Sequence, residues 1–264
     1  MKNYIPFLNS DPFVAVIRLQ GQIANSARGL DNPSLAPVIE KAFRKGKPAA
    51  VALEINCPGG SPVQSSLIAA RIRRLADEKK IPVFAFVEDV AASGGYWLAC
   101  AADEIFVDDC SITGSIGVIS AGFGLQELIG QYGVERRVHT AGKSKSMLDP
   151  FKAENPADVK RLKGWLDNIH ENFIAYVKAR RGTKLADNPD LFTGEVFIGQ
   201  KGVEQGLADG IGHIVPVMKA RFGDKVRFRR YDVRRSLLDR FGARIMGDAI
   251  GSIEDRAAFA RFGL

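Results

Sequence analysis

The chain has 264 residues and a mass of 28.7 kDa, enough for one large domain or two small ones with a sizeable core. Hydrophobic residues make up 46% and charged residues 25%, which excludes a largely disordered or fibrous protein. The formal net charge is +7, but residues 225–264 hold ten Lys and Arg against five Asp and Glu. The last 40 residues therefore carry +5 of this charge.

The cysteines and the N-terminal residues indicate in which cellular compartment the protein resides. Cys57, Cys100 and Cys110 do not suggest a disulfide framework, and they favour a reducing environment. The first residues lack the apolar core and the cleavage site of a secretory signal. The longest uncharged stretch, 110–126, holds four glycines and three serines and is too short and polar to span a bilayer. These features predict a soluble, cytoplasmic protein.

Apolar runs and helical patterns alternate along the first half of the chain. Runs of continuously apolar residues predict buried strands, and capping residues and prolines mark the helix starts. The expected strands are 13–19, 49–55, 82–87 and 105–107. The expected helices are 33–45, 61–79, with Ser61 as its cap, and a helix of small residues entered through a turn at 91–100. This alternation, at intervals of about 30 residues, predicts an α/β fold with a largely parallel sheet.

The second half is less regular. We expect a Gly-rich, strand-like run at 113–119, a helix near 123–132, a strand near 134–139 and a long amphipathic helix from 155 to 181. Residues 194–215 predict a helix and a short strand. The expected domain is 1–222. A basic C-terminal extension, 223–264, would then contain a strand at 225–231, an amphipathic helix at 234–250 and a mobile end.

Several common kinds of site are not indicated. His139, His170 and His213 are isolated from other ligand-type residues, so we expect no metal. There is no phosphate-binding loop, and no Gly-x-Gly-x-x-Gly follows the first strand, so we expect no cofactor.

Three short segments indicate chemistry. Gly59 and Gly60 follow a buried strand, where their backbone can approach a ligand and bind an oxyanion, although an ordinary turn explains them equally simply. Gly94 and Gly95 follow Ser93 at a helix start and cost about 1 kcal/mol each relative to Ala, which indicates a close approach to Ser93 or tight packing. The polar segment 142–145 contains two lysines, and an unprotonated lysine can serve as a base.

Four motifs in order and at matching intervals resemble the signal peptide peptidase A family of serine peptidases, over about residues 14–215. They are Asn56-Cys57-Pro58-Gly59-Gly60, Ala92-Ser93-Gly94-Gly95-Tyr96, Thr113-Gly114-Ser115-Ile116-Gly117-Val118 and Gly142-x-x-Lys145. The resemblance implies the ClpP/crotonase-like fold, a spiral of ββα units with a largely parallel sheet.

The resemblance also implies the roles of residues. Ser93 would be the nucleophile, Lys145 the general base and Ser115 the group that orients the lysine. The backbone of Gly59 and Gly60, with the N–H of Gly94, would form the oxyanion hole. The segment that contains Gly114, Ile116, Gly117 and Val118 would bind an extended peptide substrate. The reaction would be peptide-bond hydrolysis through an acyl-enzyme.

Some features depart from the family. Cys57 replaces the serine usual in the first motif and is interpreted as a small structural residue rather than a rival nucleophile. Lys143 competes with Lys145 for the role of base, although the spacing favours Lys145. No membrane anchor is evident, so we expect soluble peptides or unfolded segments as substrates. The family implies a ring or dome of identical subunits.

Other functions stay open at this point. An acyl-CoA enzyme of the crotonase fold would share the oxyanion hole, although the Ser93 and Lys145 pair argues against it. A capsid maturation peptidase, or an assembly protein with a vestigial dyad, would share the motifs. The basic extension is expected to pack between subunits or to contact an anionic membrane at its inner face, and nucleic acid is not expected. The extension could also be cut or held at a neighbouring active site.

Overall fold

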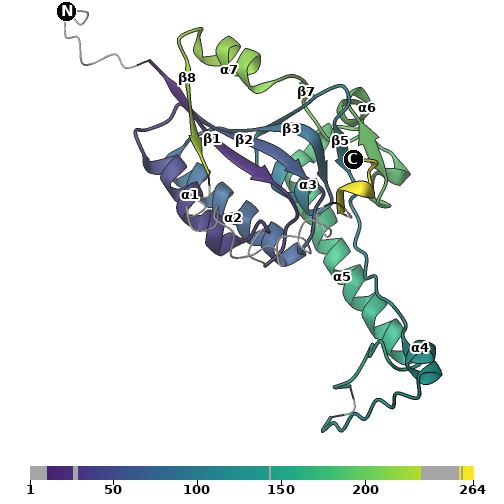
Figure 1. Cartoon of the computed structure of the whole chain (residues 1–264). Helices are drawn as coiled ribbons and strands as arrows, with labels where there is room; N and C mark the ends of the chain where they lie inside the picture. The colour runs from purple at the N-terminus through teal and green to yellow at the C-terminus, as the bar shows by residue number, and fades with distance from the viewer. Residues whose placement is uncertain (1–10, 26–28, 143, 233–255, 257) are drawn as a thin grey trace, which may run out of the picture. The chain divides into compact units, whose positions relative to one another are not determined.

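The computed structural model describes residues 11–25, 29–142, 144–232, 256 and 258–264 (Figure 1). The chain forms two compact units, one of residues 1–116 with 175–264 and one of residues 117–174. The expected helix at 234–250 lies outside the described residues.

The first unit is built on an eight-stranded sheet. Its strands are β1 (Phe13–Gln20), β2 (Ala50–Cys57), β3 (Val83–Ala92), β4 (Glu104–Val107), β5 (Ile112–Gly114), β6 (Val196–Ile198), β7 (Gly210–Ile211) and β8 (Arg227–Tyr231). The main order is β6-β5-β3-β2-β1-β8, and β4 pairs with β3 and β7. All pairs are parallel except β5 with β6. The expected α/β fold with a largely parallel sheet is confirmed.

Helices cover both faces of the central strands, which explains their continuously apolar sequences. α1 (Asn32–Arg44) and α2 (Pro62–Lys79) lie on one face, and α7 (Ile214–Phe222) lies on the other (Figure 1). On the α7 side, Val14, Val16 and Met218 share one buried cluster. Both long helices begin as expected, because Asp31 accepts a hydrogen bond from the Ser34 N–H and Ser61 accepts one from the Gln64 N–H.

β3 is longer than expected, and its extension positions the chemistry. Its first part pairs with β4 through residues 84–86, and its last part pairs with β5 through residues 90–92. The expected turn at residues 91–92 is therefore wrong, because β5 continues the sheet alongside them. The small-residue helix α3 (Gly94–Ala99) begins only after Ser93.

The other helical segments are α4 (Gln126–Gln131), α5 (Pro156–Arg181), α6 (Gln200–Glu204) and the short 3-10 turns Gly182–Lys184 and Pro189–Phe192. The expected strand near 134–139 is absent from the described second unit, and only residues 112–114 around the Gly-rich run form a strand. Of the described residues in 117–174, Phe173 alone is buried. Residues 134–139 include Glu135, Arg136 and Arg137, and the described part of this unit offers them neither a neighbouring strand nor a core.

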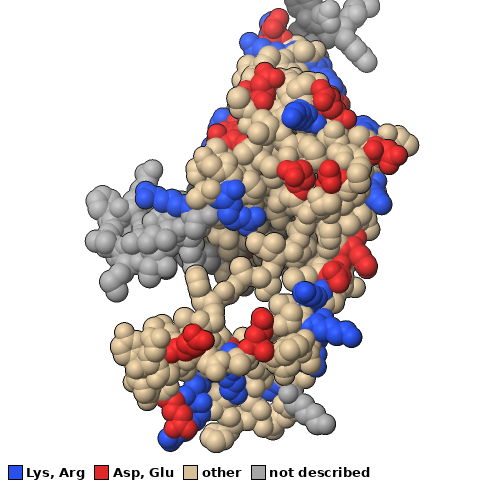
Figure 2. Space-filling model, turned by 90° about the vertical axis from the view of Figure 1, so that its right-hand side faces the viewer, with Lys and Arg blue, Asp and Glu red and all other residues tan. Residues whose placement is uncertain are grey.

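The C-terminal extension contributes directly to the first unit. β8 pairs in parallel with β1, from Phe13 opposite Arg227 to Ile17 opposite Tyr231. Near the chain end, Phe259 and Phe262 pack against a cluster of Val90, Ala92 and Ile112. On the face shown in Figure 2, basic and acidic side chains are interspersed. None of the helices in the described ranges is long and apolar enough to cross a membrane.

Candidate active site

Ser93 occupies a strained turn between β3 and α3. Its φ is +52° and its ψ −122°, an arrangement that non-glycine residues adopt at a cost of roughly 1–3 kcal/mol. The Ser93 N–H donates to the carbonyl of Gly114 at 2.9 Å, and the Ser93 carbonyl accepts from the Trp97 N–H at 3.0 Å. Its side chain is half-buried. A serine held on a tight strand-to-helix turn is the geometry that presents a nucleophile to a substrate.

The Gly59–Gly60 loop lies directly against this serine. A Cβ atom added to Gly59 would lie 2.8 Å from the Cβ of Ser93 and 3.0 Å from the N of Gly94. Gly59 and Gly60 have φ of +108° and +138°, which side-chain-bearing residues rarely adopt. The first two motifs of the sequence are thus brought together, with backbone rather than side chains beside Ser93, as an oxyanion hole requires.

Close packing also explains the glycines after Ser93. A Cβ atom on Gly94 would lie 2.5 Å from the Ser65 Oγ and 3.3 Å from the N of Gly60, and one on Gly95 would lie 2.2 Å from the carbonyl of Cys57. The two interpretations of these glycines, close approach to Ser93 and tight packing, therefore coexist. The packing holds the Gly60 and Gly94 amides next to each other.

Ile23 is a positioning residue that the sequence did not indicate. Its N–H donates to the carbonyl of Gly59 at 2.8 Å, and its carbonyl accepts from the Ser61 N–H at 2.8 Å. These bonds hold the Gly59–Gly60 backbone in place. The role is carried by main-chain atoms, so residue type gives no signal of it.

Gly114 and Ser115 lie beside Ser93 at the end of β5. Ser115 has φ +50°, and its N–H donates to the carbonyl of Glu195 at 2.7 Å. β5 is paired on both edges, with β3 and with β6. In this segment, an extended peptide could therefore form backbone hydrogen bonds only with residues after Ser115. The Ile116 side chain is fully buried in the first unit.

The remaining predicted residues belong to the second unit. Gly117 and Val118 begin it, and Lys145 is exposed on its 144–148 turn. Within this unit Arg136 donates to Asp149 at 2.9 Å, and this hydrogen bond lowers the pKa of Asp149. Lys143 lies outside the described residues. The roles of Lys145, Ser115, Gly117 and Val118 stay predictions, as do those of Ser93, of the oxyanion-hole glycines and of Gly114 and Ile116.

Cys100 and Tyr96, which follow Ser93 in the chain, are both fully buried. Burial raises the pKa of Cys100 to about 12, so its thiol stays protonated. Burial likewise raises the pKa of Tyr96, whose hydroxyl donates to the carbonyl of Leu207 at 2.9 Å. Cys57 is fully buried, which supports its interpretation as a packing residue. Ser93 is a better candidate nucleophile than Cys57, because a fully buried thiol does not reach a substrate.

Comparisons with known proteins bear on the family of this chain. The sequence model of Peptidase family S49 matches residues 76–221, more than half of the chain. The chain is 30% identical over 210 residues to the chloroplastic serine protease SPPA of Arabidopsis thaliana, covering 75% of this chain and 30% of that protein. A variant of the 1510-N membrane-bound stomatin-specific protease, solved with a substrate peptide, matches with a TM-score of 0.51 at 14% identity, covering 92% of this chain and 100% of that one.

One similar protein carries a different name. The chain is 45% identical over 287 residues to a Brucella melitensis protein named Na(+)/H(+) antiporter NhaA, covering 100% of this chain but 39% of that protein. The chain thus spans about two fifths of the first curated relatives that it matches. The name describes that whole protein, whereas the peptidase match falls within the present chain. The four motifs and these similarities together confirm the predicted resemblance, and the chain belongs to Peptidase family S49.

Proposed function

We propose that the protein is a serine endopeptidase that hydrolyses peptide bonds in extended segments, with Ser93 as nucleophile and Lys145 as general base. The observation that carries the proposal is the strained turn at Ser93, with the Gly59–Gly60 backbone packed against it. Membership of a peptidase family supports it and argues against the acyl-CoA alternative.

In the proposed first step, the Oγ of Ser93 attacks the substrate carbonyl carbon while the amine of Lys145 takes the Oγ proton. The backbone N–H groups of Gly59, Gly60 and Gly94 bind the oxyanion that forms. The C–N bond then breaks, the proton passes to the leaving amine, and an ester remains on Ser93. In the second step, water attacks this ester and Lys145 takes a proton from the water. The bond between the carbonyl carbon and the Ser93 Oγ then breaks, and Lys145 passes that proton to the Oγ. The Ser115 hydroxyl orients the lysine.

The test is digestion of a mixture of unstructured peptides in ¹⁸O-labelled water, followed by mass spectrometry. We expect each newly formed carboxyl terminus to gain one heavy oxygen from water, because the acyl-enzyme is released by hydrolysis. Ser93→Ala should form no such products. Equal product formation by Ser93→Ala would show that this serine is not the nucleophile.

We further propose that the substrates are peptides or unfolded segments in the cytoplasm. Ser93 is half-buried, and both edges of β5 are paired, so backbone groups of this segment can pair with a substrate only after Ser115. Such a site suits a single extended strand better than a folded surface. The chain corresponds to part of a Brucella protein named as a membrane antiporter, which favours a working position close to the inner face of a membrane.

We also propose that the protein assembles into a homo-oligomer through the second unit. That unit exposes an unusual set of large apolar side chains, which isolated subunits seldom leave in water. They include Phe123, 86% exposed, with Ile119, Leu128, Tyr132, Val134 and Trp165. A second copy of the chain is the proposed cover, and this fits the ring or dome that the family resemblance implies.

Phe123→Glu is expected to reduce the mass of the assembly measured by light scattering toward the 28.7 kDa of one chain. A carboxylate at this position would have to lose its water to enter an apolar interface. Val63→Glu is the matched control, because Val63 is 64% exposed on α2 of the first unit. The assembly proposal fails if both variants keep the wild-type mass, or if wild type is already a monomer.

A further inference from the structure

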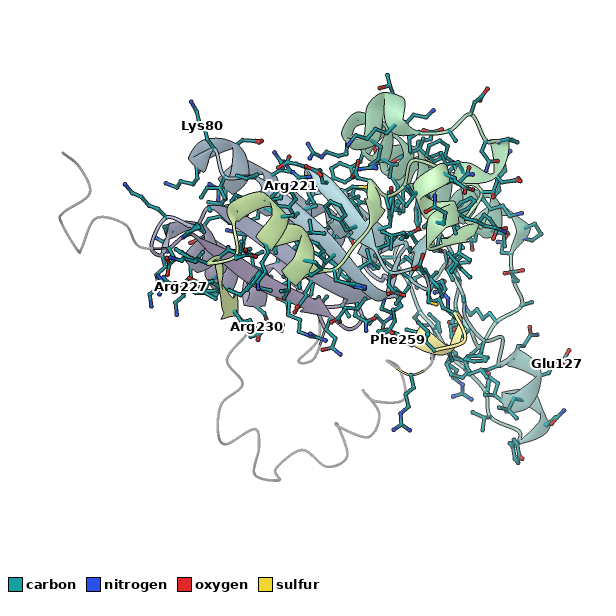
Figure 3. All side chains as sticks on the ribbon, turned by 90° about the horizontal axis from the view of Figure 1, so that it is seen from above. Lys80, Glu127, Arg221, Arg227, Arg230 and Phe259 are labelled. Atoms are coloured by element: carbon teal, nitrogen blue, oxygen red, sulfur yellow. The ribbon has the colours of Figure 1, made fainter. Side chains whose placement is uncertain are left out.

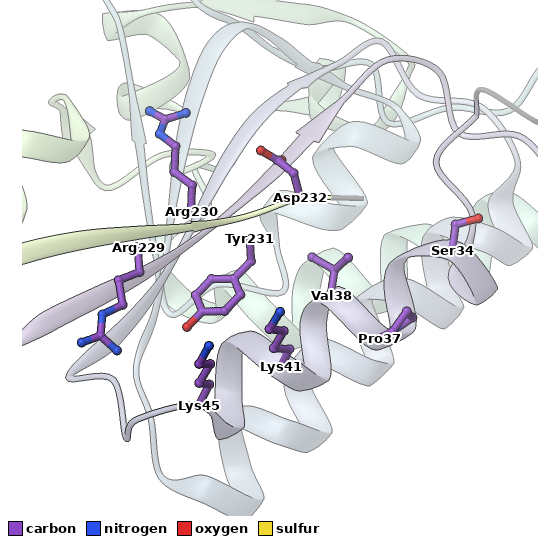
Figure 4. A pocket seen from close by; sticks show the side chains of 9 residues that line it. All are labelled: Ser34, Pro37, Val38, Lys41, Lys45, Arg229, Arg230, Tyr231 and Asp232. Atoms are coloured by element: carbon purple, nitrogen blue, oxygen red, sulfur yellow. The ribbon is translucent and has the colours of Figure 1, made fainter. Parts of the chain in front are cut away.

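A cavity lies between α1 and β8, in the first unit (Figure 4). Its volume is about 800 Å³, within the range of small-molecule sites. Lys41 and Lys45 extend from α1 toward Tyr231 on β8 (Figure 4), and Arg229 of the same strand borders the cavity at its edge. Three cationic groups from two separate elements thus border one cavity.

The charges of these groups are available to a ligand. Among the residues that the structure describes, no carboxylate pairs with Lys41 or Lys45, and the Arg229 guanidinium lies 3.9 Å from the centre of the Phe13 ring rather than on an acid. Arg230 also borders the cavity, but both of its terminal nitrogens donate to Glu54 at 2.8 Å. Asp232 supplies one opposing carboxylate, so three uncompensated cations face one acid.

Helix stability alone does not account for this arrangement. Lysines in the last turn of a helix interact favourably with its dipole, which explains Lys41 on α1. The helix dipole does not explain Arg229, which belongs to β8, distant in sequence, and borders the same cavity. Arg227 and Arg230 continue the basic character along β8 (Figure 3).

The cavity wall is apolar beside these cations. Val38 and Tyr231 are 9% and 8% exposed and, with Pro37, line the side toward α1. Lysines bind phosphate as point charges, and an apolar wall next to them suits the glycerol and first methylene groups of a lipid. We propose that this cavity binds the phosphate headgroup of an anionic phospholipid and so holds the protein at a membrane surface. The site does not depend on the proposed peptidase chemistry.

The experiment measures binding to vesicles of phosphatidylcholine with and without phosphatidylglycerol, by co-sedimentation at low and high salt. Wild type should bind only the anionic vesicles, and less at high salt because ions screen the attraction. The double variant Lys41→Glu/Lys45→Glu should bind at least roughly 30-fold more weakly, at about a fivefold contribution per basic residue. Its peptide hydrolysis in solution should stay unchanged, which separates this test from that of the peptidase.

The matched control is Lys201→Glu/Lys219→Glu, which makes the same change in net charge on exposed lysines of α6 and α7. It should bind like wild type. Equal loss in both double variants would overturn the cavity as the site, as would no binding by wild type.

Saturable binding of glycerol 3-phosphate or inorganic phosphate without vesicle binding would show that the ligand is a soluble phosphate and would overturn the lipid proposal. Binding of an acidic peptide such as polyglutamate in preference to vesicles would overturn it too.

Discussion

Lys145→Ala is expected to lower kcat for peptide hydrolysis by roughly 10⁴-fold or more, as much as Ser93→Ala does, because members of a nucleophile–base pair act as one unit. KM should change little, since neither side chain is proposed to hold the substrate. Lys145→Arg should be just as inactive, because a guanidinium keeps its proton and cannot accept the one from Ser93. The Lys145→Arg variant therefore distinguishes a residue that accepts a proton from one that contributes only a positive charge.

Lys143→Ala is the matched control for this prediction, since it removes the neighbouring lysine of the same segment. It should retain nearly the full kcat. If Lys143→Ala abolishes hydrolysis and Lys145→Ala does not, the base is Lys143 and the assignment from spacing is wrong. Full activity in Lys145→Arg would show that no lysine acts as a base at this position.

Arg181→Met is expected to lower the free energy of unfolding by about 3–5 kcal/mol, the usual cost of removing one partner of a buried ion pair. Arg181 is 4% exposed, and it donates to Asp209 and to the Gly206 carbonyl, each at 2.8 Å. Without it, the partly buried Asp209 carboxylate loses one of its donors, and the Gly206 carbonyl loses the hydrogen bond from Arg181. Urea denaturation at fixed protein concentration measures the loss.

Lys184→Met provides the comparison, because Lys184 also donates to Asp209, at 2.6 Å, but from a side chain that is 49% exposed. Its loss should change the free energy by no more than about 1 kcal/mol. An equal effect of the two variants would contradict the role given to burial.

The same ion pair predicts a pH dependence. Burial opposes ionisation of Asp209, but the hydrogen bonds from Arg181 and Lys184 outweigh it and lower the pKa of Asp209 in the folded protein. Its contribution to stability is therefore complete above the ordinary carboxyl pKa of about 3.9 and is lost as the pH falls through the lower folded value. In Asp209→Asn this part of the acid-induced loss should be absent.

The sequence predicted the regular elements well wherever burial leaves a periodic signal. β1, β2, α1, α2 and α5 lie where the apolar runs and caps place them. It failed at residues 134–139, where only Val134 and Val138 are apolar and the described part of the second unit provides no partner strand, and at residues 91–92, where pairing with β5 extends β3. Both errors have the same cause, since strand formation depends on a partner that may lie far along the chain.

Composition and local motifs alone determined the α/β class, the family resemblance and the choice of Ser93, because these depend on residue types at short spacing. Tertiary structure decided what surrounds that serine. The contact of Gly59 with Ser93, the support from Ile23 and the pairing of β8 with β1 join residues that are distant in sequence through backbone atoms. The sequence likewise gives the positive charge of the last 40 residues but not the groups beside which it lies. Folding brings Arg229 of that segment next to Lys41 and Lys45 at one cavity, because parallel pairing places β8 over α1.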